Sequence, residues 1–285
     1  DMLLWALKHK EGFIKVSGEV GTGKTLLCRK LLNALEDPFV TAYLPNPYFS
    51  AETLYCLVAE ELMAFSEGSE IEENQAQLTH QAKEQHVLAL RQIQHTLVKL
   101  AKSGKQVVLL IDEAQAMPEE TIEALRLLSN LETESDKLLQ IVLFGQPELD
   151  TILAKKNLRQ LKQRITFQHY LKPLQRKDIE QYISHRMILA GYKGGRLFDA
   201  KAISLLCRAS KGIPRLVNIL CHKALMSAFG QGDKLIQYRH MLAAISDTES
   251  VQVSWRERCV SALFSLSLCP LLYIASSIST WSYVA

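Results

Sequence analysis

The chain has 285 residues, of which 48% are hydrophobic and 22% charged, and its formal net charge is +3 at pH 7. This length suits one large and one smaller folded unit, and the composition is that of a globular protein. So small a positive charge does not by itself indicate nucleic-acid binding. The six cysteines contain no CxxC pair, which argues against a disulfide framework or zinc site and fits a reducing cytoplasm.

Strand and helix patterns alternate along the first part of the chain. Helical spacing of apolar residues predicts helices at 3–10, 26–35, 51–65, 79–102 and 118–131, with a polar loop at 66–77. Apolar runs predict strands at 13–17, 39–44, 107–111, 138–144 and 165–171. This alternation is typical of a parallel sheet between two layers of helices. We therefore predict an α/β nucleotide-binding domain at residues 1–172.

Helical patterns alone follow Pro173. They lie near 175–190, 198–209, 214–229 and 237–246 and predict a small all-helical lid domain at 173–248. The remaining residues, 249–285, form a predicted tail. Its part from 259 to 285 has no charged residue, is long enough to cross a bilayer as a helix, and follows Arg256 and Arg258. A membrane anchor, a partner-binding helix and a poorly ordered end are all compatible with this serine-rich segment.

A phosphate-binding loop of the form GxxxxGKT occupies residues 18–25, between a predicted strand and a predicted helix. Its glycines allow backbone N–H groups to point at phosphate oxygens, and the helix N-terminus adds partial positive charge. Lys24 is expected to reach the β- and γ-phosphates of ATP, and Thr25 to bind Mg²⁺. A plain strand-to-helix turn does not require Lys-Thr at its end. The predicted nucleotide contacts are Gly18, Glu19, Val20, Gly21, Thr22, Gly23, Lys24 and Thr25.

An acidic pair follows the third predicted strand. In open α/β sheets the carboxyl ends of the strands face the ligand crevice, which is where Asp112 and Glu113 are expected. Asp112 is a predicted Mg²⁺ ligand, since Mg²⁺ keeps several waters and takes few carboxylates. Glu113 is the predicted base that orients and deprotonates the attacking water. Such a pair is often only a solvated loop, but here it accompanies a phosphate loop.

Four further polar residues are candidates for contacts with the γ-phosphate. Gln146 follows the fourth strand and is expected to position the water if that strand neighbours the third; otherwise it is a turn residue before Pro147. Arg164 is the predicted finger that reaches a neighbouring subunit's ATP, with an ordinary surface arginine as the alternative, and Arg159 competes with it for this role. Arg215 opens a predicted lid helix, where its charge opposes the helix dipole unless a phosphate lies nearby.

These motifs together resemble the AAA+ ATPases, and more narrowly the secretion-associated group that includes the ExeA/GspA and MshM proteins. The MshM proteins belong to the assembly of the MSHA type IV pilus. The resemblance covers about residues 12–245 and is carried by 12–25, 109–116, 141–149 and 212–218. It implies roles in ATP and Mg²⁺ binding for Lys24, Thr25, Asp112 and Glu113. It also implies Gln146 as first sensor, Arg215 as second sensor, Arg164 as finger, and ATP-dependent self-association into a homo-oligomer.

The resulting prediction is an AAA+ ATP hydrolase that couples Mg-ATP turnover to assembly of an MSHA-like pilus or a secretion apparatus. It is expected in the cytoplasm, with the tail as a candidate anchor to the inner membrane. Two alternatives stay open. One is a DNA-associated ATPase of transposition targeting or replication loading, which the basic stretch 155–164 would serve; a solvated face or subunit contact is favoured for this stretch. The other is a nucleotide-gated scaffold with little hydrolysis.

Overall fold

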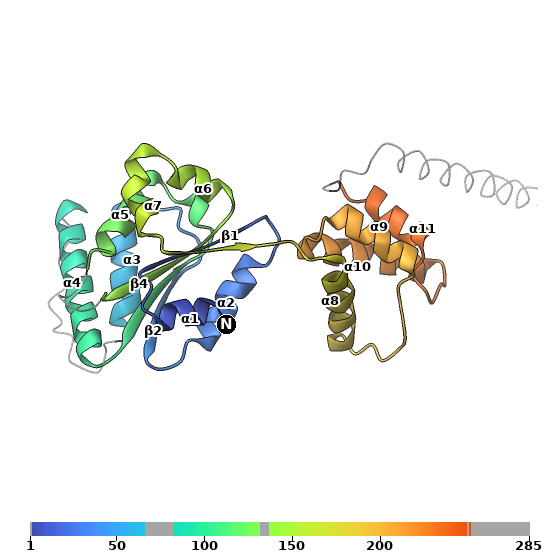
Figure 1. The fold of residues 1–285 in the computed structure, drawn as a ribbon, viewed down its shortest axis with the longest axis horizontal. Coiled ribbons are helices and arrows are strands. Elements are labelled where there is room, and N and C mark those ends of the chain that lie inside the picture. The colour runs from blue at the N-terminus through green and yellow to red at the C-terminus, as the bar shows by residue number, and fades with distance from the viewer. Residues whose placement is uncertain (1, 66–81, 132–136, 250, 252–285) are drawn as a thin grey trace, which may run out of the picture. The chain divides into compact units, whose positions relative to one another are not determined.

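The computed structural model describes residues 2–65, 82–131, 137–249 and 251. These residues form two compact units, of which the first ends at Lys172 and the second begins at Pro173 (Figure 1). The predicted loop 66–77 and the predicted tail segment 259–285 lie outside the described residues. Within the described part of the chain, no helix is both long and apolar enough to cross a membrane.

A five-stranded parallel sheet organises the first unit, in the order β2-β3-β4-β1-β5. Its strands are β1 Phe13–Gly18, β2 Phe39–Leu44, β3 Gln106–Ile111, β4 Leu139–Gly145 and β5 Phe167–Leu171. Every neighbouring pair is parallel. Parallel neighbours need a crossover between them, which is why helices lie on both faces of the sheet. The predicted α/β fold with a parallel three-layer sheet is confirmed.

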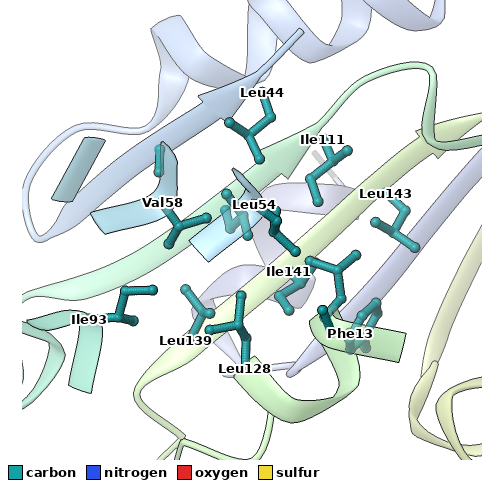
Figure 2. Close-up of a cluster of buried hydrophobic side chains, with 14 of the residues drawn as sticks. Phe13, Leu44, Leu54, Val58, Ile93, Ile111, Leu128, Leu139, Ile141 and Leu143 are labelled. Carbon is teal, nitrogen blue, oxygen red and sulfur yellow. The ribbon is translucent and has the colours of Figure 1, made fainter. Parts of the chain in front are cut away.

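Each central strand is buried on both sides because its alternate side chains enter two different cores. One core lies under α1 Met2–Lys8 and α2 Lys24–Ala34 and receives the side chains of Val108, Leu110 and Phe144. The other receives Leu109, Ile111 and Ile141, all fully buried (Figure 2 shows part of it). Residues 108–111 are consecutive in the chain, and their side chains point alternately to the two faces of the sheet. One apolar run therefore contributes to both cores.

Three longer helices cover the second core. They are α3 Ala51–Met63, α4 Ala82–Lys102 and α5 Glu119–Leu128, and they lie together on one side of the sheet in Figure 1. Leu54, Ile93 and Leu128 are their fully buried contacts with the sheet. The helix predicted to reach residue 131 ends at Leu128, because the N–H of Leu131 bonds to the carbonyl of Leu128 in a tight turn instead.

Short helical segments lie between the longer elements of the first unit, and the sequence patterns did not predict them. They are the 3₁₀ turns η1 Ala114–Ala116 and η2 Lys156–Leu158, and the helices α6 Glu148–Leu153 and α7 Arg159–Arg164. None is longer than six residues, so none offers two full turns of apolar periodicity. Packing holds them: Leu149, Leu158 and Leu161 are fully buried in the core shared with α3 and α5.

The described residues of the second unit form four helices, close to the positions that the helical patterns predicted. They are α8 Arg176–Leu189, α9 Ala200–Ser210, α10 Pro214–Gly230 and α11 Tyr238–Ser246. Leu206, Leu220 and Met241 are fully buried at its centre. The Asp199 side chain caps α9 by accepting the N–H of Lys201 at 3.2 Å. Pro214 starts α10 at the first helical position, where a missing N–H does no harm.

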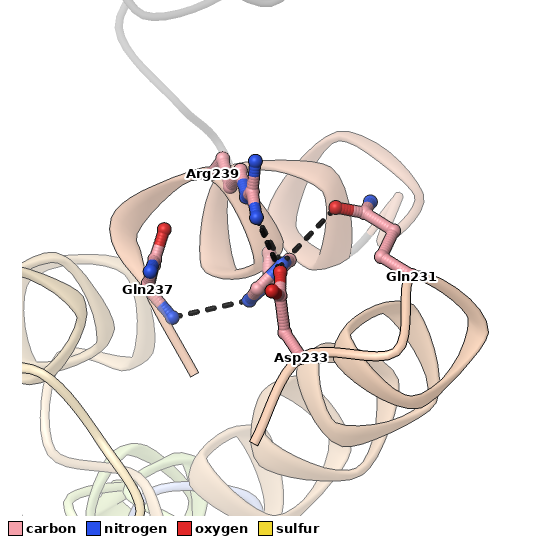
Figure 3. A network of polar contacts seen from close by, with 5 residues as sticks. Gln231, Asp233, Gln237 and Arg239 are labelled. Atoms are coloured by element: carbon pink, nitrogen blue, oxygen red, sulfur yellow. Dashed lines mark hydrogen bonds and ion pairs between the residues drawn. The ribbon is translucent and has the colours of Figure 1, made fainter. Parts of the chain in front are cut away.

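A polar network joins the end of α10 to the start of α11 (Figure 3). The fully buried His240 ring accepts the N–H of Gln237 on Nδ1 at 3.1 Å. The other ring nitrogen, Nε2, lies 2.9 Å from Asp233 Oδ2 and 3.2 Å from both Gln231 Oε1 and Arg239 Nε. Arg239 also binds the Asp233 carboxylate. Because a buried polar ring is stable only when hydrogen-bonded, these contacts fix the α10–α11 turn.

Candidate nucleotide-binding site

The predicted phosphate loop connects β1 to α2 with two glycines in the left-handed region of backbone conformation. Gly21 has φ 82° and Gly23, which precedes the first residue of α2, has φ 97°. Both values favour glycine. Thr22 closes the loop, since its hydroxyl donates to the carbonyl of Glu19 at 2.8 Å. The loop thus reaches the N-terminus of an 11-residue helix, whose first N–H groups have no partner within the helix.

Lys24 is the buried cation of this loop, with 5% of its surface exposed. Its Nζ donates to the carbonyls of Gly18 at 2.8 Å and Glu19 at 3.0 Å, so the side chain folds back over the loop. Burial lowers the pKa of Lys24, and the nearby carboxylates of Glu113, Asp112 and others act in the opposite direction. The ammonium therefore sits between the loop and the acidic pair, where a phosphate chain would complete its coordination.

Asp112 and Glu113 lie at the carboxyl end of β3, as their place after an apolar run predicted. Asp112 is 2% exposed, and its Oδ1 accepts the N–H of Glu113 at 2.9 Å. Glu113 has φ 51°, a left-handed conformation that is uncommon for a residue with a Cβ atom. The following turn, η1, begins with the Ala116 N–H bonded to the Glu113 carbonyl at 2.8 Å. This turn directs the two carboxylates differently although they are adjacent in sequence.

Strand order brings the loop and the acidic pair together. β4 lies between β1 and β3, with Ser17 in register with Gly145 and Ile111 in register with Leu143. Gln146, one residue after β4, is thereby placed next to Glu113, and its Nε2 donates to Glu113 Oε2 at 3.1 Å. The prediction for Gln146 required that β4 lie next to the strand that ends at Asp112, and this requirement is met.

Gln115 belongs to this group of side chains, and sequence reasoning gave it no role. Its Nε2 donates to Glu113 Oε2, and its Oε1 accepts the N–H of Gln146 at 2.9 Å. Its signal in the sequence is its position two residues after Glu113, inside the segment 109–116 that carries the family resemblance. That signal is weak, because the direction of a side chain in a 3₁₀ turn depends on the tertiary contacts of the turn.

The donor set fits Mg-ATP. A buried carboxylate from Asp112 and a half-buried hydroxyl from Thr25, the second residue of α2, are the hard oxygen ligands that Mg²⁺ takes in small number. The loop offers backbone N–H groups, the α2 N-terminus and Lys24 to phosphates. Among the described residues, no cluster of three or more His, Cys, Asp or Glu side chains could hold a metal alone. This set suits a metal that shares its shell with phosphate and water.

The two candidate finger arginines lie away from the loop, on α7. Arg164 is the last residue of that helix, and its Nη1 donates to the Ser129 hydroxyl at 2.9 Å. Arg159 is its first residue. Both side chains are exposed. Arg215 lies in the second unit, in the first turn of α10, and is also exposed. The roles assigned to these arginines stay predictions.

Comparison with known proteins gives one family and one curated relative. A family described as "AAA domain" matches residues 7–153. General secretion pathway protein A of Aeromonas hydrophila is 36% identical over 263 residues, which are 92% of this chain and 45% of that protein. The chain therefore spans about half the length of the curated relative it matches.

Solved structures with the same fold include ORC2, Cdc6p and RuvB proteins. The ORC2 protein of Aeropyrum pernix matches with a TM-score of 0.58 and 16% identity, covering 90% of this chain and 67% of that one. Cdc6p of Pyrobaculum aerophilum matches with a TM-score of 0.59 and 14% identity, covering 85% and 64%. A RuvB variant of Thermotoga maritima matches with a TM-score of 0.51 and 14% identity, covering 86% and 67%. At these identities the likeness extends to the fold alone.

Proposed function

This chain belongs to the AAA domain family, in the AAA+ group related to general secretion pathway protein A, and from this premise we propose that it hydrolyses Mg-ATP to drive assembly of an MSHA-like type IV pilus or a secretion apparatus. The observation that carries the ATPase proposal is the convergence of Lys24, Asp112, Glu113 and Gln146 at one edge of the sheet. The proposal for the assembled structure rests on the curated relative and on the resemblance to the secretion-associated group.

Each residue has one task in the proposed reaction. Lys24 and the loop N–H groups bind the phosphates and stabilise the charge that spreads over the γ-phosphate oxygens as its bond to ADP breaks. Asp112 and Thr25 would hold Mg²⁺, which supplies charge neutralisation at the phosphates when bound. Glu113 accepts a proton from the attacking water, and the Gln146 amide orients that water or the γ-phosphate. The protein's contribution is therefore positioning and charge.

A homo-oligomer would complete this site. Arg164 at the end of α7 is exposed and can extend toward the nucleotide of a neighbouring copy, where a guanidinium stabilises transition-state charge. Arg215 in the second unit would contact the nucleotide of its own chain and report its state through closure of the lid. We place the ATPase on the cytoplasmic side of the inner membrane, with residues 259–285 as its candidate anchor.

The DNA-associated alternative has less support from the contacts of the basic stretch. Lys155 binds the Glu119 carboxylate, so this cation of the basic stretch has a partner within its own unit. A positive surface made for phosphates would leave its cations free to release counterions from DNA. The solved structures of the ORC2, Cdc6p and RuvB proteins share only the fold with this chain, and a fold does not carry function.

The first experiment measures Mg-ATP turnover by the chain, with and without duplex DNA, for wild type, Glu113→Gln and the control Glu60→Gln. Glu60 is exposed on α3, so its variant is expected to match wild type. Loss of general-base catalysis in Glu113→Gln is expected to lower turnover roughly 10²- to 10⁴-fold while ATP still binds. Strong stimulation by DNA would favour the alternative, and ATP binding without turnover would favour the scaffold.

The assembly role needs a separate test in the source cell. Replacement of the chromosomal gene with one encoding Glu113→Gln is expected to abolish the formation of surface pili or the secretion of proteins into the medium. The same replacement with Glu60→Gln should leave both unchanged. Normal pili and normal secretion in cells that carry an inactive ATPase would contradict the assembly proposal and leave the ATPase proposal intact.

A further inference from the structure

We propose that Gln115 is a positioning residue that aligns the Glu113 carboxylate with Gln146 by bridging the ends of β3 and β4. The inference rests on the proposed ATPase function and extends it to a residue outside the phosphate loop, the acidic pair and the sensors. It is carried by the two hydrogen bonds of one side-chain amide, one to a carboxylate oxygen of Glu113 and one to the backbone of Gln146.

The chemistry of the two partners fixes the orientation of the Gln115 amide. A carboxylate only accepts hydrogen bonds and a backbone N–H only donates them. Nε2 must therefore face Glu113 Oε2, and Oε1 must face the Gln146 N–H at 2.9 Å. If the amide were reversed, Oε1 would face the Glu113 carboxylate, another acceptor, and Nε2 would face the Gln146 N–H, another donor. A glutamine thus satisfies both partners at once.

A glycine at the end of β4 makes room for this bridge. A Cβ atom added to Gly145 would lie 3.3 Å from Gln115 Oε1 and 2.8 Å from Leu149 Cδ2. The second of these distances is too short for a carbon–carbon contact, and the first would force the amide to move. Gly145 therefore allows the Gln115 amide to approach the β4 backbone closely, which is a common reason for glycine beside a functional contact.

Glu113 needs such support because its backbone is in the left-handed region, with φ 51°. A residue with a Cβ atom holds this conformation only when its surroundings determine it. The Asp112 carboxylate holds the Glu113 N–H, and Gln115 holds its side chain. The Gln146 side chain donates to the same oxygen, Glu113 Oε2, at 3.1 Å. The base and the first sensor are therefore coupled through one oxygen and one bridging amide.

The experiment compares Gln115→Met and Gln115→Glu with wild type and with Gln94→Met. Methionine has similar length and neither donates nor accepts strongly, so it removes both bonds. Glutamate keeps an acceptor for the Gln146 N–H but sets a second negative charge against Glu113. Gln94 is exposed on α4, and its variant controls for the change of side chain. For both Gln115 variants we expect kcat to fall roughly 10- to 100-fold at unchanged ATP affinity, since a displaced base loses alignment with its substrate.

Crystal structures of the Gln115→Met and Gln94→Met variants provide a readout that does not depend on turnover. The Glu113 carboxylate is expected to leave the Gln146 amide in the first variant and to stay beside it in the second. A Glu113 carboxylate in its wild-type place in Gln115→Met, or wild-type kcat in both Gln115 variants, would overturn the inference. Absence of turnover in the wild type would instead refute the proposed function, and the crystal structures would still decide whether Gln115 positions Glu113.

Discussion

Replacement of Gly212 is predicted to destabilise the second unit, by an amount that follows from the local backbone geometry. Gly212 lies two residues after the end of α9 and has φ 77°, and the preceding Lys211 has φ 50°, so two successive residues are left-handed. Its carbonyl accepts the N–H of Leu174 at 2.8 Å, which holds the chain entering α8 against the turn before α10. A Cβ atom at residue 212 would lie 2.2 Å from the Leu174 carbonyl oxygen and 3.0 Å from its nitrogen. Backbone atoms, rather than a flexible side chain, would have to move.

Gly212→Ala therefore combines two destabilising effects. The left-handed backbone costs about 1–2 kcal/mol for a residue with a Cβ atom, and the forced backbone shift costs about 1–3 kcal/mol. Gly232→Ala is the matched control, because Gly232 has φ 71° in the same unit but no atom within 4 Å of an added Cβ. The difference between the two variants isolates the steric effect at about 1–3 kcal/mol.

Hydrogen exchange followed by mass spectrometry on the full chain measures this difference in the second unit alone. We expect the amides of α9 and α10 to lose protection roughly 5- to 150-fold more in Gly212→Ala than in Gly232→Ala. This ratio is the difference of about 1–3 kcal/mol between the two variants, expressed as a change in the equilibrium constant for opening. Amides of β3 and β4 should keep wild-type exchange. Equal protection in the two variants would refute the argument that the contact with Leu174 requires glycine.

Three further predictions concern charged groups. Lys24→Ala is expected to weaken binding of a fluorescent ATP analogue roughly 10- to 150-fold by loss of charge-assisted hydrogen bonds, and Lys30→Ala, exposed on the same helix, should bind as wild type does. If Arg164 is the finger, Arg164→Ala lowers turnover by on the order of 10³-fold at unchanged ATP affinity; such a loss in Arg159→Ala instead would reassign the role. The hydrogen bond from the Arg239 side chain holds the pKa of Asp233 below its ordinary value of 3.8. This contact therefore stabilises the second unit above about pH 4, and the stabilisation is lost as the pH falls through the pKa that Asp233 has in the folded state. Thermal unfolding between pH 3 and 6 should show a shallower acid-side slope for Asp233→Asn than for wild type, and equal slopes would contradict the assignment.

Local signals identified most of the fold because they act over a few residues. The apolar runs at β3 and β4 predict buried strands wherever they are placed, since each must be covered on both faces. The short helices α6 and α7 carry no comparable signal. Their buried leucines hold them in the core, and an ion pair between Asp150 of α6 and Lys15 of β1 adds to this. The roles of Arg164 and Arg215 remain predictions, because each would act on a nucleotide through an arrangement beyond its own compact unit.

The amino-acid sequence by itself determined the chemistry of the phosphate loop. Glycines that permit positive φ, followed by Lys24 and Thr25 at a helix start, specify a phosphate site through local backbone conformation. The tertiary structure decided which residues meet there. Inserting β4 between β1 and β3 brings Gln146 to Glu113, and a 3₁₀ turn directs Gln115 between them. Residues more than 30 positions apart meet only because of strand order, which is set by the packing of the whole sheet and leaves no mark on any single segment.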